Sequence, residues 1–458
     1  MRVAGVLIAA MVLALIPASA TAQDQHSRNM SLVKNLPYEA RNGDVPNFGT
    51  DIEFARIAGR QYALAGSYDN GLQVVDITNP RRSEIVAVYD CGVTQGDVQV
   101  FRQADKPGRV FAGYTSDTTG DGTSTCYREA QALGFNVHKP NGTGKNGTFI
   151  VELTNPLAPS TVSFVEVEQG SHNHTIHPSG RYLYNSNSDL ITSFQPAVEI
   201  FDIGNFAAPA KVGELALPTR PGLGTESHDI TFSDDGNRAY SAALSQGVVI
   251  DTTDPAAPSI VSSWLDPAIN VWHQADPYSA GGRDFVLVED EFAGAAGGPV
   301  CPSGGFHIYE VTGALERAPR KVGYWNIDDV GPTNNPEGTC TAHVFDIHER
   351  RQVMTVAYYN GGVRVVDLSG LHGGEGLRQI GFYKTENADS WSAKTPRIER
   401  NGSFFLYGND IARGLDVYRY DATRPESDSG GTWLGAAAAL RLPAAPRGET
   451  NYVCLLQT

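Results

Sequence analysis

The sequence Gly71-Leu-Gln-Val-Val-Asp-Ile-Thr-Asn-Pro80 returns in variant form along most of the chain. Each copy is a short β-rich run that ends on an acidic residue, followed in most copies by an apolar residue, then Thr, Ser or Gly and a turn. Such a run, closed by Asx or Pro turn chemistry, predicts a strand that leaves a sheet at a fixed corner. The other copies are Gly147–Pro156, Val198–Asn205, Gly247–Pro255, Gly305–Thr312 and Gly362–Ser369.

Each repeat can be written as four strands joined by tight polar turns, most clearly between Ser227 and Trp264. A single four-stranded sheet cannot bury both of its faces, so it must stack on its neighbours. The sequence therefore predicts an all-β, seven-bladed β-propeller of four-stranded antiparallel blades. The first strands of the seven units begin near Asp51, Asp97, Ser171, Ser227, Trp272, Ala342 and Ser390.

The seventh unit has no fourth strand of its own after Gly414–Tyr420. An isolated strand, Ser31–Leu36, precedes the first unit and matches the fourth-strand pattern of Ala210–Leu215. We expect this N-terminal strand to complete the last blade and close the ring, which removes two exposed sheet edges.

With its recurring third-strand motif, the chain resembles the LVIVD-repeat β-propeller family over roughly residues 30–421. The resemblance implies an exported or cell-surface bacterial or archaeal propeller. The family has no single assigned activity, so function has to be argued from a site.

The ends of the chain differ from the repeats. Residues 1–22 combine an early Arg2, an apolar core and small-x-small patterns at Ala18–Ala20 and Ala20–Ala22, which are typical of a secretory signal peptide. A membrane anchor is the weaker alternative, because the apolar run is shorter than the ~20 residues of a spanning helix. We expect residues 30–421 to form the propeller and residues 422–458, rich in Pro, Ser, Gly and Ala, to form a loosely ordered tail.

These features predict a secreted, periplasmic or cell-surface protein with no transmembrane segment, and we expect a monomer. Four of the five cysteines form two pairs that are close in sequence, Cys91 with Cys126 and Cys301 with Cys340. In an exported chain two local disulfides are the natural interpretation, and isolated buried thiols are the alternative. The formal net charge of −16 argues against a nucleic acid or an anionic lipid surface as partner.

Histidines recur at one position of the first strand. His172 and His228 each stand eight residues before a turn glycine, Gly180 and Gly236, and His273 stands nine before Gly282. With His343 in the sixth unit, four consecutive blades carry a histidine at the start of the innermost strand. Imidazoles at one height of the channel predict a transition-metal site for Fe, Cu or Zn.

In the other three blades Thr50, Gly96 and Trp391 or Ser392 stand at this position. They would leave one side of the site open, as a catalytic metal requires. A purely structural role, in which each histidine bonds a neighbouring blade, is the alternative, and His174 is a second candidate beside His172. Carboxylates near these strand starts are candidate hydrogen-bond partners of the imidazoles, namely Glu226, Asp229, Asp51, Asp97 and Asp276.

The arrangement is similar, by analogy alone, to the four-histidine iron centre of carotenoid cleavage oxygenases and to the channel site of selenium-binding/methanethiol oxidase proteins. We therefore expect a metal-dependent oxidoreductase or oxygenase that acts on a small organic substrate, and a metal-activated hydrolase cannot be separated from it by sequence. The alternative is a non-enzymatic envelope protein that binds a protein or a glycan. An insertion at residues 116–147 and a Gly-rich loop at 292–305 are expected to shape a binding mouth.

Overall fold

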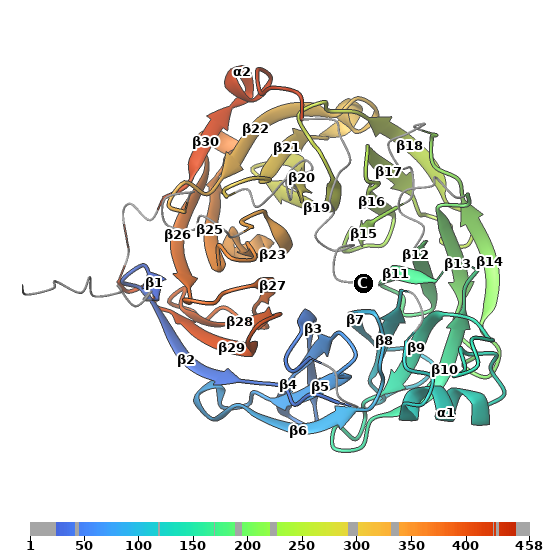
Figure 1. Ribbon diagram of the computed structural model, residues 1–458. Coiled ribbons are helices and arrows are strands. Elements are labelled where there is room, and N and C mark those ends of the chain that lie inside the picture. The colour runs from blue at the N-terminus through green and yellow to red at the C-terminus, as the bar shows by residue number, and fades with distance from the viewer. Residues whose placement is uncertain are drawn as a thin grey trace, which may run out of the picture.

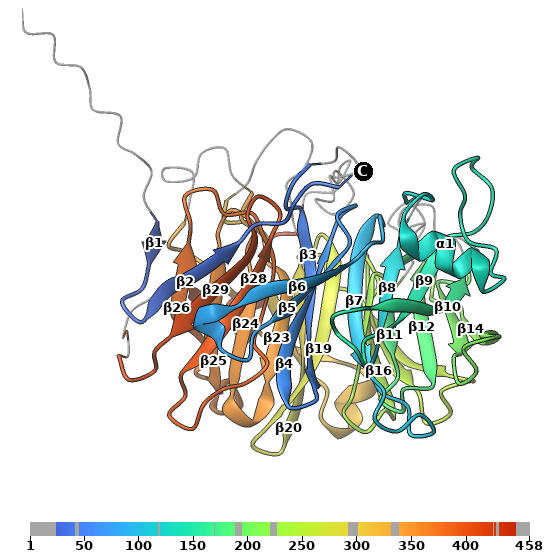
Figure 2. The same ribbon diagram turned by 90° about the horizontal axis from the view of Figure 1, so that it is seen from below.

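The chain forms a ring of seven antiparallel sheets around a central channel (Figure 1). The computed structural model describes residues 24–41, 45–117, 120–168, 170–187, 195–219, 227–291, 301–330, 339–424, 426 and 430–445. In each blade the first strand lines the channel and later strands lie progressively further out, and the strands run along the channel when the ring is seen from the side (Figure 2).

The first four blades each consist of four strands. Blade 1 contains β3 (Gly49–Ile57), β4 (Arg60–Ser67), β5 (Leu72–Asp76) and β6 (Glu84–Tyr89). Blade 2 contains β7 (Gln95–Phe101), β8 (Phe111–Ser116), β9 (Gly147–Glu152) and β10 (Ser160–Glu166). Blade 3 contains β11 (Ser171–Ile176), β12 (Tyr182–Asn187), β13 (Val198–Asp202) and β14 (Ala210–Leu215). Blade 4 contains β15 (Asp229–Phe232), β16 (Arg238–Ala242), β17 (Gly247–Asp251) and β18 (Ser259–Trp264).

The last three blades use strands from the two ends of the chain. Blade 5 contains β19 (Trp272–Ala280), β20 (Arg283–Asp290), β21 (Phe306–Glu310), β22 (Arg320–Asn326) and, outermost, β30 (Thr432–Gly435). Blade 6 contains β23 (His343–His348), β24 (Val353–Ala357), β25 (Val363–Gly370), β26 (Gly376–Lys384) and, outermost, β1 (Gln25–His26). Blade 7 contains β27 (Ser390–Lys394), β28 (Phe404–Asp410), β29 (Gly414–Tyr420) and β2 (Met30–Leu36).

Two features of this ring were predicted from the repeats and are confirmed. The seven channel strands begin within two residues of the predicted positions. The N-terminal strand β2 pairs antiparallel with β29, from Met30 opposite Tyr420 to Leu36 opposite Leu415, and so supplies the fourth strand of blade 7.

The fifth strands were not predicted. β1 pairs with β26 and β30 pairs with β22, so both ends of the chain extend a blade that already has four strands. β30 is followed by the short helix α2 (Ala436–Ala439), and the amide of Ala445 donates to Pro267 O at 2.7 Å. Within residues 422–458, which were expected to form a loosely ordered tail, residues 432–435 form β30 because the open edge of β22 provides backbone partners for them.

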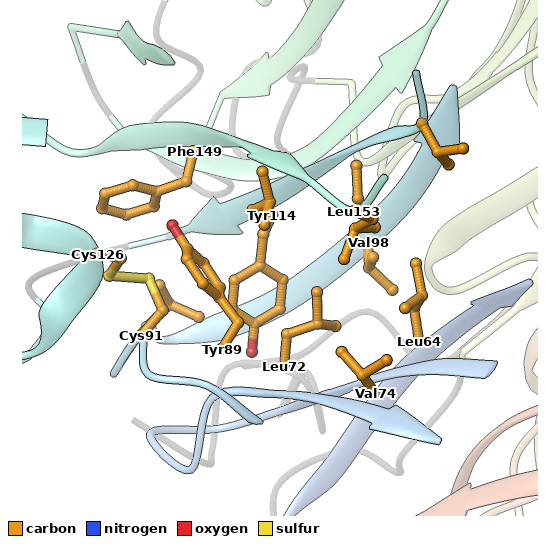
Figure 3. Packing of buried hydrophobic residues seen from close by; sticks show 14 of the residues in the cluster. Leu64, Leu72, Val74, Tyr89, Cys91, Val98, Tyr114, Cys126, Phe149 and Leu153 are labelled. Carbon is orange, nitrogen blue, oxygen red and sulfur yellow. A yellow bond between two sulfur atoms is a disulfide. The ribbon is translucent and has the colours of Figure 1, made fainter. Parts of the chain in front are cut away.

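Each interface between neighbouring blades has its own cluster of buried apolar side chains. Figure 3 shows the cluster between blades 1 and 2, where Leu64 and Val74 from one sheet face Val98 and Phe149 from the next. The cluster between blades 7 and 1 includes Leu36 of β2. Burial of apolar surface is the dominant favourable contribution to folding, so each cluster stabilises the interface between two neighbouring blades.

The acidic residue at or near the end of the third strand has a structural role, as its recurrence in six of the seven blades suggests. Asp76 Oδ1 accepts a hydrogen bond from Thr78 N at 2.9 Å, and Asp202 Oδ1 accepts one from Gly204 N at 2.8 Å. An arginine at the start of the second strand pairs with the same carboxylate, as Arg60 does with Asp76. These contacts fix the corner between the strands.

The insertion after β8 carries the helix α1 (Thr125–Ala132) on the outside of blade 2 (Figure 1). Both predicted disulfides are confirmed, since Cys91 is bonded to Cys126 in α1 and Cys301 is bonded to Cys340. Two disulfides in one chain are typical of an oxidising compartment. In the described part of the chain, no helix has the length and apolar character needed to cross a membrane.

Candidate metal centre

The four predicted histidines lie side by side at one end of the channel strands. Ring centroids are 4.4 Å apart for His172 and His228, 4.1 Å for His228 and His273, and 4.4 Å for His273 and His343. None of the four side chains is more than 3% exposed. The structure therefore brings together imidazoles from blades 3, 4, 5 and 6.

Local irregularity at the strand starts helps to position these rings. The register of β11 with β12 shifts between Ser171 and Asn173, so His172 is the extra residue of a β-bulge. The register of β19 with β20 shifts in the same way around His273. A bulge redirects the side chain of the extra residue, which here lies among the imidazoles.

The Nδ1 atoms of the four rings face acceptors outside the cluster. His228 Nδ1 lies 3.1 Å from the carbonyl oxygen of His273, and His343 Nδ1 lies 2.6 Å from that of Trp391. His172 Nδ1 is hydrogen-bonded to Asp117 Oδ2 at 3.2 Å, and His273 Nδ1 lies 2.6 Å from Glu289 Oε2. A carbonyl oxygen can only accept, so Nδ1 of His228 and His343 carries the ring proton and Nε2 carries a lone pair.

The Nε2 atoms lie on the inner side of the cluster. His172 Nε2 is 2.9 Å from His228 Nε2. His273 Nε2 is 3.6 Å from Glu291 Oε2, and His343 Nε2 is 3.7 Å from Glu291 Oε1. Ligand atoms of His228, His273 and Glu291 all lie within 4.8 Å of one another, so these three residues could hold a metal ion.

Glu291 is itself held by the sixth blade. The hydroxyl of Tyr359 donates to Glu291 Oε1 at 2.8 Å, and both side chains are buried. The ring of Tyr359 lies 4.7 Å from that of His343. Gln95 approaches from blade 2, with its Nε2 3.3 Å from His172 Nε2.

Burial determines the protonation of the cluster. It is the main cause that lowers the pKa of His228 and of His273 well below the usual histidine value, and neighbouring histidines lower both further. Burial also lowers the pKa of His343 to about 3 and raises the pKa of Glu289 well above its usual value. The imidazoles of His228, His273 and His343 are thus neutral at physiological pH, which is the form that binds metal.

The predicted carboxylate partners differ from those in the structure. Asp51 pairs with Lys394 at 2.9 Å, and Asp97 pairs with His174 at 2.9 Å, which places His174 outside the cluster of four. Asp276 accepts from Thr231 and Gln274, and Asp229 accepts from the amide of Ile230. Glu226 lies outside the described residues.

Asp117, Glu289 and Glu291, which do contact the imidazoles, were missed from the sequence. They stand at the ends of the second strands β8 and β20, which meet the starts of the channel strands only through antiparallel pairing. The signal that would have found two of them is the run Glu289-Asp-Glu291, three acidic residues in succession at the end of an apolar strand.

A cavity of about 380 Å³ in the channel ends on His228, His273 and His343. Its wall carries one lysine, Lys394, and six carboxylates, from Asp51, Glu53, Asp97, Asp229, Asp276 and Asp346. Burial, then Asp276 and Asp97, raises the pKa of Asp229 to about 8, and burial raises that of Asp276 to about 6. The cavity gives a small ligand a path to the inner face of the imidazoles.

No protein-family model matches the chain, and no curated protein matches it. Among solved structures, the chain is similar to the Cps50 (Swd1) β-propeller domain of Myceliophteria thermophila, with a TM-score of 0.48 and 10% identity over 84% of this chain and 100% of that chain. A likeness of this degree carries no argument about function. The sheets themselves show a seven-bladed propeller, and the resemblance to LVIVD-repeat proteins stays a prediction.

Proposed function

We propose that this protein binds a transition-metal ion through His228, His273 and Glu291, with His172 and His343 as flanking ligands, and uses it for redox or oxygen chemistry on a small organic substrate. The observation that carries the proposal is the 2.9 Å approach of His172 Nε2 to His228 Nε2.

The short distance between His172 Nε2 and His228 Nε2 supports a bound cation at this point. His228 Nε2 has no proton, because Nδ1 donates to a carbonyl oxygen. His172 Nδ1 faces the Asp117 carboxylate, so its Nε2 also presents a lone pair. Two lone pairs at this distance repel one another, whereas two nitrogens bound ~2.0–2.1 Å from one metal ion are separated by roughly 3 Å.

The charge of the site supports the same conclusion. Glu289 and Glu291 are at most 1% exposed, and their carboxyl oxygens lie beside His273 and His343, whose pKa values burial lowers. Burial raises the pKa of Glu289, so a positive charge at the site would favour its ionised form. A divalent ion beside Glu291 would supply that charge.

The donor set indicates which metals to expect. Two imidazoles and one carboxylate with open positions are the ligands of non-haem iron(II) oxygenases, and the same set binds zinc in catalytic sites. The cavity on the inner face of the imidazoles leaves room for substrate. Iron would provide the oxygen chemistry of the proposal, whereas zinc would support hydrolysis of the substrate.

We also propose that the protein is exported, as a secreted or periplasmic monomer. The two disulfides support this proposal, because such bonds persist in oxidising compartments. The signal-peptide prediction falls on residues 1–22, which lie outside the described residues.

The test is elemental analysis of the purified protein after export, beside the His228→Ala/His273→Ala double variant. A His348→Ala variant serves as control, since His348 lies at the far end of β23 and pairs with Asp346. We expect near-stoichiometric iron or zinc in the parent and the control, and its loss from the double variant at unchanged circular dichroism. If all three proteins lack metal after reconstitution with each ion, the imidazoles are structural and a binding platform becomes the working account.

A further inference from the structure

The walls of the channel cavity are strongly acidic, and only some of their carboxylates have a basic partner. Lys394 Nζ lies 2.9 Å from Asp51 and 2.9 Å from Glu53. Asp97 pairs with His174, and Asp346 pairs with His348 at 3.1 Å. Four of the six carboxylates therefore have a basic partner.

The other two carboxylates, Asp229 and Asp276, lie beside the candidate ligands. Asp229 directly follows His228, and Asp276 is three residues after His273 on the neighbouring channel strand. Within the described residues, no Lys, Arg or His lies at ion-pair distance from either of them. Their hydrogen-bond donors, Ile230 N, Thr231 Oγ1 and Gln274 Nε2, are all neutral.

This part of the wall also carries an aromatic side chain, Phe232, three residues after Asp229 on β15. Phe54, Phe345 and Trp391 line the cavity as well. Aromatic faces attract organic cations, and carboxylates complete their recognition by charge and by accepting N–H groups. An ammonium group beside Asp229 and Asp276 would favour their ionised form, whereas an anion would disfavour it.

We propose that the substrate of this centre is a small organic cation, a protonated aliphatic amine, whose ammonium group lies between Asp229 and Asp276 and whose carbon chain points at His228 and His273. The proposal concerns the substrate class and rests on the proposed metal function. The cavity of about 380 Å³ is near the lower end of small-molecule sites, so the amine has few carbon atoms.

An inorganic cation fits the same two carboxylates less well. Only His228, His273 and Glu291 form a group of three or more metal-binding side chains within reach of one ion in the described residues. Asp229 and Asp276 thus lack a third protein ligand, whereas divalent calcium takes six to eight oxygens. An ammonium group needs only three acceptors.

The test is isothermal titration calorimetry at fixed ionic strength with three ligands of equal size, n-butylammonium, n-butanol and butyrate. We expect one butylammonium site, with binding of the neutral and anionic ligands at least about tenfold weaker, as for the loss of a charge-assisted hydrogen bond. Asp229→Asn and Asp276→Asn should each weaken butylammonium binding by about tenfold. Asp346→Asn is the matched control, because this carboxylate of the same cavity already pairs with His348, and it should retain the parent affinity.

Repeating the titration on metal-free protein and on the His228→Ala/His273→Ala variant separates the two proposals. Butylammonium binding in protein that never takes up metal would refute the metal function and leave the cation site standing. Metal uptake without butylammonium binding, or equal binding of all three ligands, would refute the cation site alone. Displacement of butylammonium by equimolar calcium chloride would show an inorganic ion site instead.

Discussion

Tyr359 combines a left-handed backbone with a buried hydroxyl that donates to a carboxylate. Its φ of 43° is unfavourable for a residue with a Cβ atom. Two backbone hydrogen bonds to Ser390, both 3.0 Å, hold the residue in this conformation. Backbone strain of this kind is concentrated at functional sites, and here it aims the phenol at Glu291.

We predict that Tyr359→Phe weakens metal binding by about 10- to 100-fold, the usual effect of losing a hydrogen bond to a metal ligand. Competition with a chelator of known affinity measures the effect. The control is Tyr358→Phe, because Tyr358 is equally buried and its hydroxyl has no hydrogen-bond partner in the described residues.

If Tyr359 acts by positioning Glu291, the effects of changing the two residues should not add. In a Glu291→Gln background, Tyr359→Phe should have little additional effect on metal affinity, since the carboxylate that it orients is already gone. Fully additive losses would show that the tyrosine acts through packing against His343 instead.

At the scale of elements, Trp433 of β30 joins two blades. A Cβ atom added to Gly323 of β22 would lie 1.9 Å from its ring, and one added to Gly376 of β26 would lie 2.2 Å from it. The indole therefore lies flat against a glycine of blade 5 and a glycine of blade 6. The C-terminal strand thus holds the two blades together from the outside.

We predict that Trp433→Ala lowers the free energy of unfolding by about 2 kcal/mol, below the range for a fully buried tryptophan because the ring is partly exposed. Urea denaturation followed by circular dichroism measures the change. Leu440→Ala, in the same segment but 68% exposed, is expected to leave stability unchanged. Equal midpoints for the two variants would contradict the bridging role of Trp433.

How far the sequence predicts the molecule depends on whether a feature is repeated. The channel strands and the four histidines recur in register, so comparison between copies places them without knowledge of tertiary contacts. β30 occurs once, and its pairing depends on tertiary contacts, among them the edge of β22 and the two glycines that contact Trp433. Glu291 and Tyr359 follow the second strands of different blades, and their contact depends on how the blades pack.

At the scale of the whole molecule, β2 closes the ring by joining the two ends of the propeller in one sheet. Met30 packs in the cluster between blades 6 and 7, and Leu36 packs between blades 7 and 1. Loss of this strand would remove apolar contacts from two interfaces and expose the edge of β29.

We predict that a chain beginning at residue 37 is aggregation-prone, because an open hydrophobic edge pairs with other chains. Size-exclusion chromatography of freshly purified protein is the measurement. A chain beginning at residue 28, which keeps all of β2 but lacks β1 and its flanking residues, is the control and should elute like the parent. Identical elution of the two truncated chains would contradict a closing role for β2.

The pairing of β2 with β29 also sets an order of events during biosynthesis. The strand that closes the ring is among the first parts of the propeller to be made, and its partner β29 is made after all the other strands of the seven blades except β30. The groups around the imidazoles come from Asp117 in blade 2 to Trp391 in blade 7, so the full set is present only after β27 has been made. A metal ion bound as proposed would therefore have all of its surrounding groups only after β27 has been made, and a chain that stalls before β27 would lack the carbonyl oxygen of Trp391 that accepts from His343 Nδ1.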